Sequence, residues 1–175
     1  VYFLANEIIA RGDVSGMTHF GFHGGIATTL LRYSIREGTA VFEDGRLVRT
    51  RFDDAIREIA AGDAFGCMVL TEPGAGSDLG AIRTRAVERD GKWYLSGEKI
   101  FITSGHGQYQ LVLAQTEDTQ DLKCLSLFLV PRVIERDGER IHNVRITKLE
   151  KKLGHNASAT CSLLYDESEG VLIGE

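Results

Sequence analysis

The sequence predicts an α+β fold in which a short helical segment, residues 1–65, precedes a mostly antiparallel β-barrel or sandwich, residues 66–175. Two observations predict it. The spacing of apolar residues changes from helical to extended near residue 66, and the extended runs beyond that point are short and separated by Gly or Asp. A chain of 175 residues with 43% hydrophobic side chains is long enough to bury a core. We expect two domains, the first of them partial.

The first segment carries helical spacing and two turn or cap signals. Its apolar residues predict helices over residues 4–11 and 23–36. An Asp-Gly pair within residues 42–47 predicts a small hairpin or an extended excursion. A third short helix follows. Asp53 or Asp54 is expected to cap it, because an aspartate side chain accepts hydrogen bonds from the first free amides of a helix.

The second segment consists of short extended runs. The clearest hairpin turns at Asp90-Gly91, a pair that favours a type I′ turn. In the strand that follows, Trp93 and Leu95 share one face and Tyr94 lies on the other. Runs of this length with turn signals between them indicate a small barrel or sandwich. They cover roughly residues 67–71, 83–89, 92–103, 109–116, 124–130, 142–149 and 159–173.

Composition excludes several classes of function. A net charge of −5 and an isoelectric point near 5.6 argue against a broad basic surface, so we do not expect nucleic acid as a partner. Cys67, Cys124 and Cys161 lie far apart without a CxxC pair, which favours packed, reduced thiols over disulfides or zinc. No apolar run approaches the roughly 20 residues of a membrane span. These features predict a cytoplasmic protein of bacterial type, with the mitochondrial matrix as the alternative.

Histidine spacing gives no sign of a metal centre. A helical zinc site of the HExxH kind needs two histidines four residues apart with a glutamate beside the first, and no such pattern occurs. We therefore predict no metal, and expect each histidine to lie at the surface or to pack as a satisfied core residue. The histidines are His19, His23, His106, His142 and His155.

The segment from Thr71 to Asp78 has the composition of a ligand-holding loop. It follows an apolar run, Gly74 and Gly76 can take positive φ and admit a ligand to the backbone, and Pro73 stiffens the entry. Exposed amides in such a bend suit an anion such as a phosphate. The loop is neither a Walker loop nor a GxGxxG fingerprint, so local chemistry alone also allows a tight turn without a ligand.

A second motif further along the sequence helps to decide between a ligand-holding loop and a turn without a ligand. Leu70–Asp78, followed by Gly97–Gly105, resembles the acyl-CoA dehydrogenase family, in which a TEPGAGSD loop precedes a hairpin that reads roughly GxKxWITNG. The resemblance covers most of residues 66–175, and implies a β-rich middle domain that binds FAD. It implies a full-length protein that oxidises an acyl-CoA to its trans-2-enoyl-CoA, passes electrons to an electron-transfer flavoprotein and forms a homodimer or homotetramer.

The resemblance also implies roles for individual residues. Leu70 and Thr71 would meet the pyrimidine edge of the flavin, and Thr103 would lie near its N5 atom. Phe101 stands where the family usually has Trp, and Ser77 would contact the flavin phosphate or the pantetheine arm of the substrate. Taken singly, each residue is better explained as an ordinary strand, turn or core residue, and only the matched order of all of them favours a flavin site. The residues expected to bind the cofactor are Met68, Leu70, Thr71, Gly76, Ser77, Phe101, Ile102 and Thr103.

We expect the chain to be a fragment that lacks the catalytic base. In the family, a glutamate removes the α-proton of the thioester, and it usually comes from a helical domain after the β domain. We therefore assign no catalytic residue here and expect the excerpt alone to be inactive. Two alternatives remain open: a flavin oxidase or monooxygenase with the same fold, and a flavin-containing protein associated with DNA.

Overall fold

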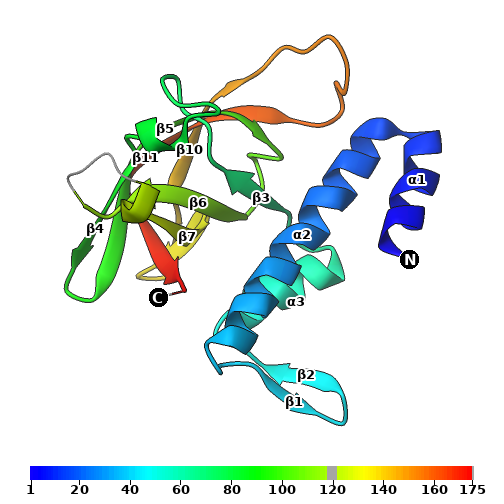
Figure 1. The fold of residues 1–175 in the computed structure, drawn as a ribbon, viewed down its shortest axis with the longest axis horizontal. Helices are drawn as coiled ribbons and strands as arrows, with labels where there is room; N and C mark the ends of the chain where they lie inside the picture. Colours follow the sequence, from blue (N-terminus) through cyan, green and yellow to red (C-terminus); the bar gives the residue numbers. More distant parts are fainter. Residues whose placement is uncertain (118–121, 175) are drawn as a thin grey trace.

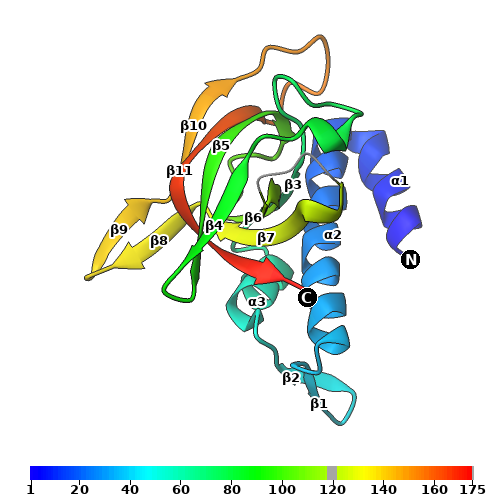
Figure 2. The same cartoon turned by 60° about the vertical axis from the view of Figure 1, so that its left-hand side comes forward.

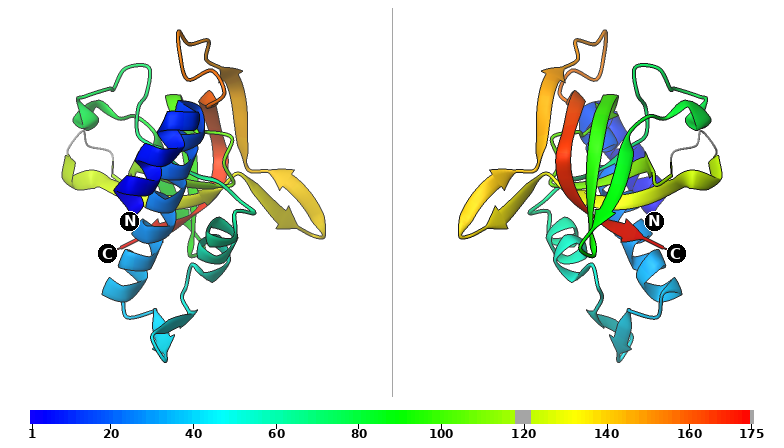
Figure 3. Two further views of the ribbon diagram at one scale, coloured as in Figure 1. Left: turned by 90° about the vertical axis from the view of Figure 1, so that its right-hand side faces the viewer. Right: turned by 90° about the vertical axis from the view of Figure 1, so that its left-hand side faces the viewer.

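A computed structural model describes residues 1–117 and 122–174. Three α-helices, α1 (Tyr2–Gly12), α2 (Val14–Arg36) and α3 (Asp53–Ala61), lie along one side of the β-strands (Figure 1). Figure 3 shows the blue helices in front of the strands in one view and behind them in the other. The structure confirms the predicted α+β fold class, with the helices first and a barrel after them.

Helix α2 is longer than the sequence predicts. It begins at Val14 instead of residue 23, because the Asp13 side chain caps it by accepting a hydrogen bond from the Gly16 amide. The glycines that argue against a helix here allow α2 to approach α1 closely. A Cβ atom on Gly24 would lie 3.4 Å from the ring of Tyr2. Tertiary packing therefore outweighs the low helix propensity of glycine.

The prediction of an aspartate cap on α3 is wrong. The N-cap residue is Phe52, which makes no side-chain capping bond, and Asp53 instead pairs with Arg57 at 2.5 Å within the helix. The Thr50 hydroxyl accepts a hydrogen bond from the Phe52 amide at 2.7 Å and closes the turn before the helix. Ahead of this turn, the predicted hairpin is present as β1 (Val41–Glu43) and β2 (Arg46–Arg49), beyond the C-terminal end of α2 (Figure 1).

Each predicted extended run contains a strand, and one hairpin was missed. The Asp90-Gly91 turn has positive φ at both residues, 52° and 74°, as a type I′ turn requires. Strands β8 and β9 form the missed hairpin, which projects away from the barrel (Figure 2). The strands are β3 (Gly66–Val69), β4 (Arg85–Arg89), β5 (Lys92–Thr103), β6 (Tyr109–Gln115), β7 (Leu125–Pro131), β8 (Val133–Arg136), β9 (Glu139–His142), β10 (Val144–Leu149) and β11 (Thr160–Ile173).

The main sheet closes on itself. Within the described residues, five strands pair in the cyclic order β11, β5, β4, β6, β7 and back to β11, while β10 adds to β11 and β3 adds to β6. Most pairs are antiparallel, and β6 pairs in parallel with β3 and β4. Closure leaves few free strand edges and encloses one face of every barrel strand.

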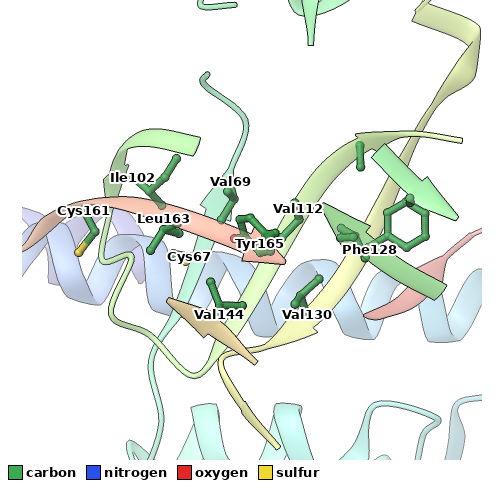
Figure 4. Close-up of a cluster of buried hydrophobic side chains, with 13 residues drawn as sticks. Cys67, Val69, Ile102, Val112, Phe128, Val130, Val144, Cys161, Leu163 and Tyr165 are labelled. Carbon is green, nitrogen blue, oxygen red and sulfur yellow. The ribbon is translucent and has the colours of Figure 1, made fainter. Parts of the chain in front are cut away.

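Two apolar cores result. One fills the barrel, where Phe128 and Leu163 have no exposed surface and Tyr165 is 1% exposed (Figure 4). Cys67 and Cys161 lie in the same cluster, and all three cysteines are buried thiols outside any disulfide, as predicted. The other core joins α2 and α3 to the outside of the barrel through side chains of both segments. The division into two domains near residue 65 stays a prediction.

Candidate functional site

The loop that follows β3 is a closed turn with open space around its glycines. The amide of Glu72 donates to the carbonyl of Ala75 at 2.9 Å, and the reverse bond measures 3.1 Å. Neither Gly74 nor Gly76 uses the positive φ that the sequence allows. A Cβ atom on either residue would meet nothing within 4 Å. The chain's own packing therefore does not require glycine at these positions, and the loop presents bare backbone to its surroundings.

A buried ion pair anchors this loop to β5. The ammonium of Lys99, whose side chain has no exposed surface, lies 2.9 Å from the Oε1 atom of Glu72. Glu72 also accepts hydrogen bonds from the amides of Arg83 at 2.7 Å and Thr84 at 3.0 Å, and from the Thr84 hydroxyl at 2.5 Å. Glu72 therefore ties the loop to the segment before β4.

The surroundings shift the pKa values of both charged groups. Burial by itself raises the pKa of Glu72, but the hydrogen bonds from Thr84 and Arg83 and the charge of Lys99 outweigh it, so the pKa lies below its usual value. Burial lowers the pKa of Lys99, and Glu72 offsets this only in part. Several hydrogen bonds to the carboxylate make the pair tolerable in a site that water does not reach.

The lowered pKa of Glu72 predicts how stability depends on pH. An unfolded glutamate titrates near 4.5, and the folded value lies below that. The carboxylate therefore stabilises the fold fully above pH 4.5, and this contribution is lost as the pH falls through the folded pKa. In urea titrations, the difference in unfolding free energy between wild type and Glu72→Gln should be largest near neutral pH and shrink in acid. A difference independent of pH would contradict this origin.

Strand β5 carries a bulge at the second motif. The register of β5 with β11 shifts between Lys99 and Ile102, so that one residue of β11 lies opposite two of β5. Phe101, in the bulge, has a φ of 59° and is 61% exposed. A large aromatic side chain rarely takes this left-handed backbone conformation, and exposing the ring gains nothing from burial. The bulge thus holds an aromatic surface outward, while Ile102 beside it points into the barrel core (Figure 4).

The two motifs meet through the backbone. The Ile100 amide donates to the Thr71 carbonyl at 2.9 Å, and Lys99 donates to the Leu70 carbonyl at 2.9 Å. Segments 29 residues apart in the sequence are therefore held side by side at the end of β3, with Thr71 and Thr103 half-buried at their ends. This arrangement offers hydroxyls, free backbone and an aromatic ring within one region.

Most of the residues predicted to bind the cofactor lie in one region of the structure, but two of their side chains do not face it. Leu70, Thr71, Phe101 and Thr103 lie at the meeting of the motifs, and Gly76 and Ser77 are exposed on the adjoining loop. Two predicted residues point elsewhere. The Ile102 side chain is buried in the barrel, so only its backbone is available to a ligand. The Met68 side chain packs towards the helices and lines an apolar groove of about 450 Å³ along α2 with Met17, Phe22 and Leu111.

Sequence reasoning missed two polar features of the site. Lys99 follows Leu95 and Gly97 at alternate positions of β5, and this spacing alone assigns the lysine to the inward face of the strand. A second contact joins His19 of α2 to Ser104, with Nδ1 and the hydroxyl oxygen 2.8 Å apart. It links the helices to the end of the second motif. No signal in the sequence connects these two residues, which lie 85 positions apart.

Three of the histidines gather where α2 meets the barrel. The rings of His19 and His106 lie 5.6 Å apart, and Phe65 lies within 6 Å of both rings and of His23. The Nδ1 atoms of His23 and His106 are buried without a hydrogen-bond partner, which differs from the satisfied packing we expected. Within residues 1–117 and 122–174, no group of His, Cys, Asp or Glu side chains is arranged to hold a metal. None of the helices there combines the length and hydropathy of a membrane span.

Comparison with known proteins identifies the family. The sequence profile described as acyl-CoA dehydrogenase, middle domain, matches residues 67–168, which is more than half of the chain. The chain belongs to the acyl-CoA dehydrogenase family. The match begins at β3 and ends within β11, so it includes both motifs of this acyl-CoA dehydrogenase segment and the ion pair between them. The resemblance inferred from the two motifs is thereby confirmed.

Individual relatives agree with this assignment. A broad-specificity linear acyl-CoA dehydrogenase, FadE5 of Mycobacterium tuberculosis, is 43% identical over 62% of the chain and 20% of its own length. A butyryl-CoA dehydrogenase of Syntrophomonas wolfei is 35% identical over 85% of the chain and 25% of its own length. The structure of a glutaryl-CoA dehydrogenase from Mycobacterium smegmatis in complex with FADH2 superimposes with a TM-score of 0.63 at 30% identity, covering 90% of this chain and 35% of that one. The chain thus spans a fifth to a quarter of these curated relatives.

Proposed function

We propose that the protein containing this chain is an FAD-dependent acyl-CoA dehydrogenase that oxidises an acyl-CoA to its trans-2-enoyl-CoA. The observation that carries the proposal is the contact between the two motifs, in which Lys99 and Ile100 of β5 hold the carbonyls of Leu70 and Thr71. The family relationship supplies the class of reaction. The substrate class rests on the same relationship and on the apolar groove beside Met68, which suits an acyl chain.

The residues present fit a flavin. Phe101 offers an exposed aromatic surface, on which a flat heteroaromatic ring would lose contact with water. The open space at Gly74 and Gly76 leaves room for a phosphate-bearing chain against the backbone. When bound, FAD supplies the acceptor for the hydride that leaves the β-carbon of the substrate.

The chain's own residues bind and orient in this proposal. Leu70 and Thr71 would hold the polar edge of the ring with amide and hydroxyl donors, and Thr103 would supply a hydroxyl near its N5 atom. Ser77 contacts a phosphate or the pantetheine arm. A carboxylate from elsewhere in the full-length protein takes the α-proton, since we assign the base to no residue of this chain. An electron-transfer flavoprotein, a homo-oligomeric state and a cytoplasmic or mitochondrial-matrix location complete the proposal.

The test uses the full-length protein. It should purify with bound FAD and lose the yellow colour of oxidised flavin when an acyl-CoA is added without oxygen, with an enoyl-CoA as the product. Persistent colour with acyl-CoAs of short, medium and long chain would contradict the proposal. Rapid return of the colour in air, without an electron-transfer protein, would favour an oxidase.

Thr103→Ala tests the role of the second motif. If the hydroxyl stabilises charge that develops during hydride transfer, its removal should slow flavin reduction by about 100-fold, the lower end of the range for losing one preorganised donor. The apparent Kd for acyl-CoA should change much less, because the interaction grows only as the reaction proceeds. Stopped-flow absorbance separates the two. Equal effects on rate and binding would remove Thr103 from this role.

Gly76→Ala tests the loop. A methyl group there meets nothing in the chain and the backbone φ is ordinary, so stability should stay within about 1 kcal/mol or rise slightly. The same methyl group would occupy the space that we assign to the cofactor. We expect FAD affinity to fall at least about tenfold, equivalent to 1.4 kcal/mol. Isothermal titration of the flavin-free protein measures it, and unchanged affinity would contradict the assignment.

A further inference from the structure

Lys99 contacts more than its counter-ion. Its ammonium donates to the carbonyl of Leu70 at 2.9 Å and to the carbonyl of Leu113 at 2.8 Å, in addition to pairing with Glu72. An ammonium has three donors, and these three acceptors use all of them. A lysine without exposed surface is costly to bury, so a residue that only filled this space would be better replaced by an apolar one.

The contact with Leu70 fixes the direction of a peptide group. The peptide bond between Leu70 and Thr71 is trans, so the carbonyl of Leu70 and the amide N–H of Thr71 point in opposite directions. Since the carbonyl points at the ammonium, the N–H of Thr71 points away from it. The carbonyl of Thr71 is also held, by the Ile100 amide, so the peptide cannot turn without breaking a bond to β5.

We propose that Lys99 is a positioning residue that orients and polarises the Leu70–Thr71 peptide, so that its N–H becomes a stronger donor toward the flavin. This rests on the proposed function, which places the edge of the flavin at Leu70 and Thr71. A cation bonded to a carbonyl draws electron density through the amide and strengthens the N–H on its other side, as in cooperative hydrogen-bond chains. Such a donor favours a flavin on which negative charge has accumulated.

Glu72 confines the effect to this peptide. Together the ammonium and the carboxylate carry no net charge, and Glu72 is held by three further donors from Arg83 and Thr84. The ion pair therefore contributes little field at long range. The flavin would therefore be influenced mainly by the oriented N–H of Thr71. The strengthening of this donor should be lost whenever the ammonium is removed, even if the carboxylate is neutralised at the same time.

Two variants of the FAD-loaded full-length protein test this. Lys99→Met removes the ammonium and leaves the carboxylate. The double variant Lys99→Gln/Glu72→Gln removes both charges and keeps two amides that can pair with each other. We expect both to make the flavin about tenfold harder to reduce, which for a two-electron couple is a midpoint potential about 30 mV more negative. Val130→Ala is the control, because it opens the barrel core at a fully buried position of β7, outside both motifs, and should leave the potential unchanged.

A measurement without flavin accompanies the potentials. In the flavin-free protein, the Thr71 amide should exchange its hydrogen faster in the double variant than in wild type and Val130→Ala, because its peptide is no longer held from β5. If Lys99→Met does not fold, the double variant alone tests whether Lys99 orients the Leu70–Thr71 peptide.

The outcomes separate the two proposals. A wild-type protein without FAD, or with FAD that no acyl-CoA reduces, contradicts the proposed function. If wild type behaves as a dehydrogenase and the double variant keeps its potential, Lys99 is merely structural and the inference is overturned. A shift in Lys99→Met alone would be traced to the bare carboxylate and would also overturn it.

Discussion

Replacing Lys99 with methionine is expected to lower the free energy of unfolding by about 3–5 kcal/mol, the range measured when one partner of a buried ion pair is removed. The loss arises less from the broken pair than from what remains. Glu72, 6% exposed, keeps a charge without its cation, and the carbonyls of Leu70 and Leu113 lose a donor. Urea unfolding followed by circular dichroism measures the difference.

Lys148→Met provides a matched control. Lys148 also pairs with a glutamate, Glu150, at 2.6 Å, but its side chain is 64% exposed. An exposed pair of this kind contributes at most about 1 kcal/mol, because water and salt screen it. Equal losses in the two variants would show that burial does not decide the strength of the Lys99 pair, contrary to the argument for the loop.

Local signals in the sequence located most strands and helices. The Asp90-Gly91 turn, with alternating Trp93, Tyr94 and Leu95 after it, placed a hairpin correctly because a type I′ turn needs only two adjacent residues. The hairpin of β8 and β9 carries the same signal at Asp137-Gly138, with positive φ at both residues, but no strand was predicted between residues 130 and 142. That error was avoidable, whereas the early start of α2 depends on its packing against α1.

The candidate site also has features that local sequence predicted and features that it could not predict. The loop and the second motif were recognisable as sequence, and the threonines followed from the motif positions. The bulge that turns Phe101 outward was not, because register between β5 and β11 is set by strands about 60 residues apart. The ion pair of Glu72 with Lys99 likewise joins the loop after β3 to β5, across 27 positions of the sequence. Contacts that depend on closure of the barrel lie beyond any single stretch of sequence.

Gly97→Ala is expected to destabilise the protein by about 3 kcal/mol, at the upper end for forcing extra volume into a packed core. Gly97 lies in β5 with a φ of 156°, and a Cβ atom there would lie 2.7 Å from the backbone Cα of Thr84. A backbone atom cannot move aside as the end of a side chain can. Thr84 is also the residue whose amide and hydroxyl bind Glu72, so the displacement would weaken the anchor of the loop.

Gly91→Ala separates this clash from the cost of an unusual backbone. Gly91 also has positive φ, 74°, but a Cβ atom there would meet nothing within 4 Å, so only the conformational cost of about 1–2 kcal/mol applies. If the displaced Thr84 is what matters, Gly97→Ala should lose more stability than Gly91→Ala and should also lower FAD affinity, which Gly91→Ala should not. Comparable losses with unchanged FAD binding would mean that Thr84 yields without disturbing Glu72, and that the loop is anchored from β5 alone.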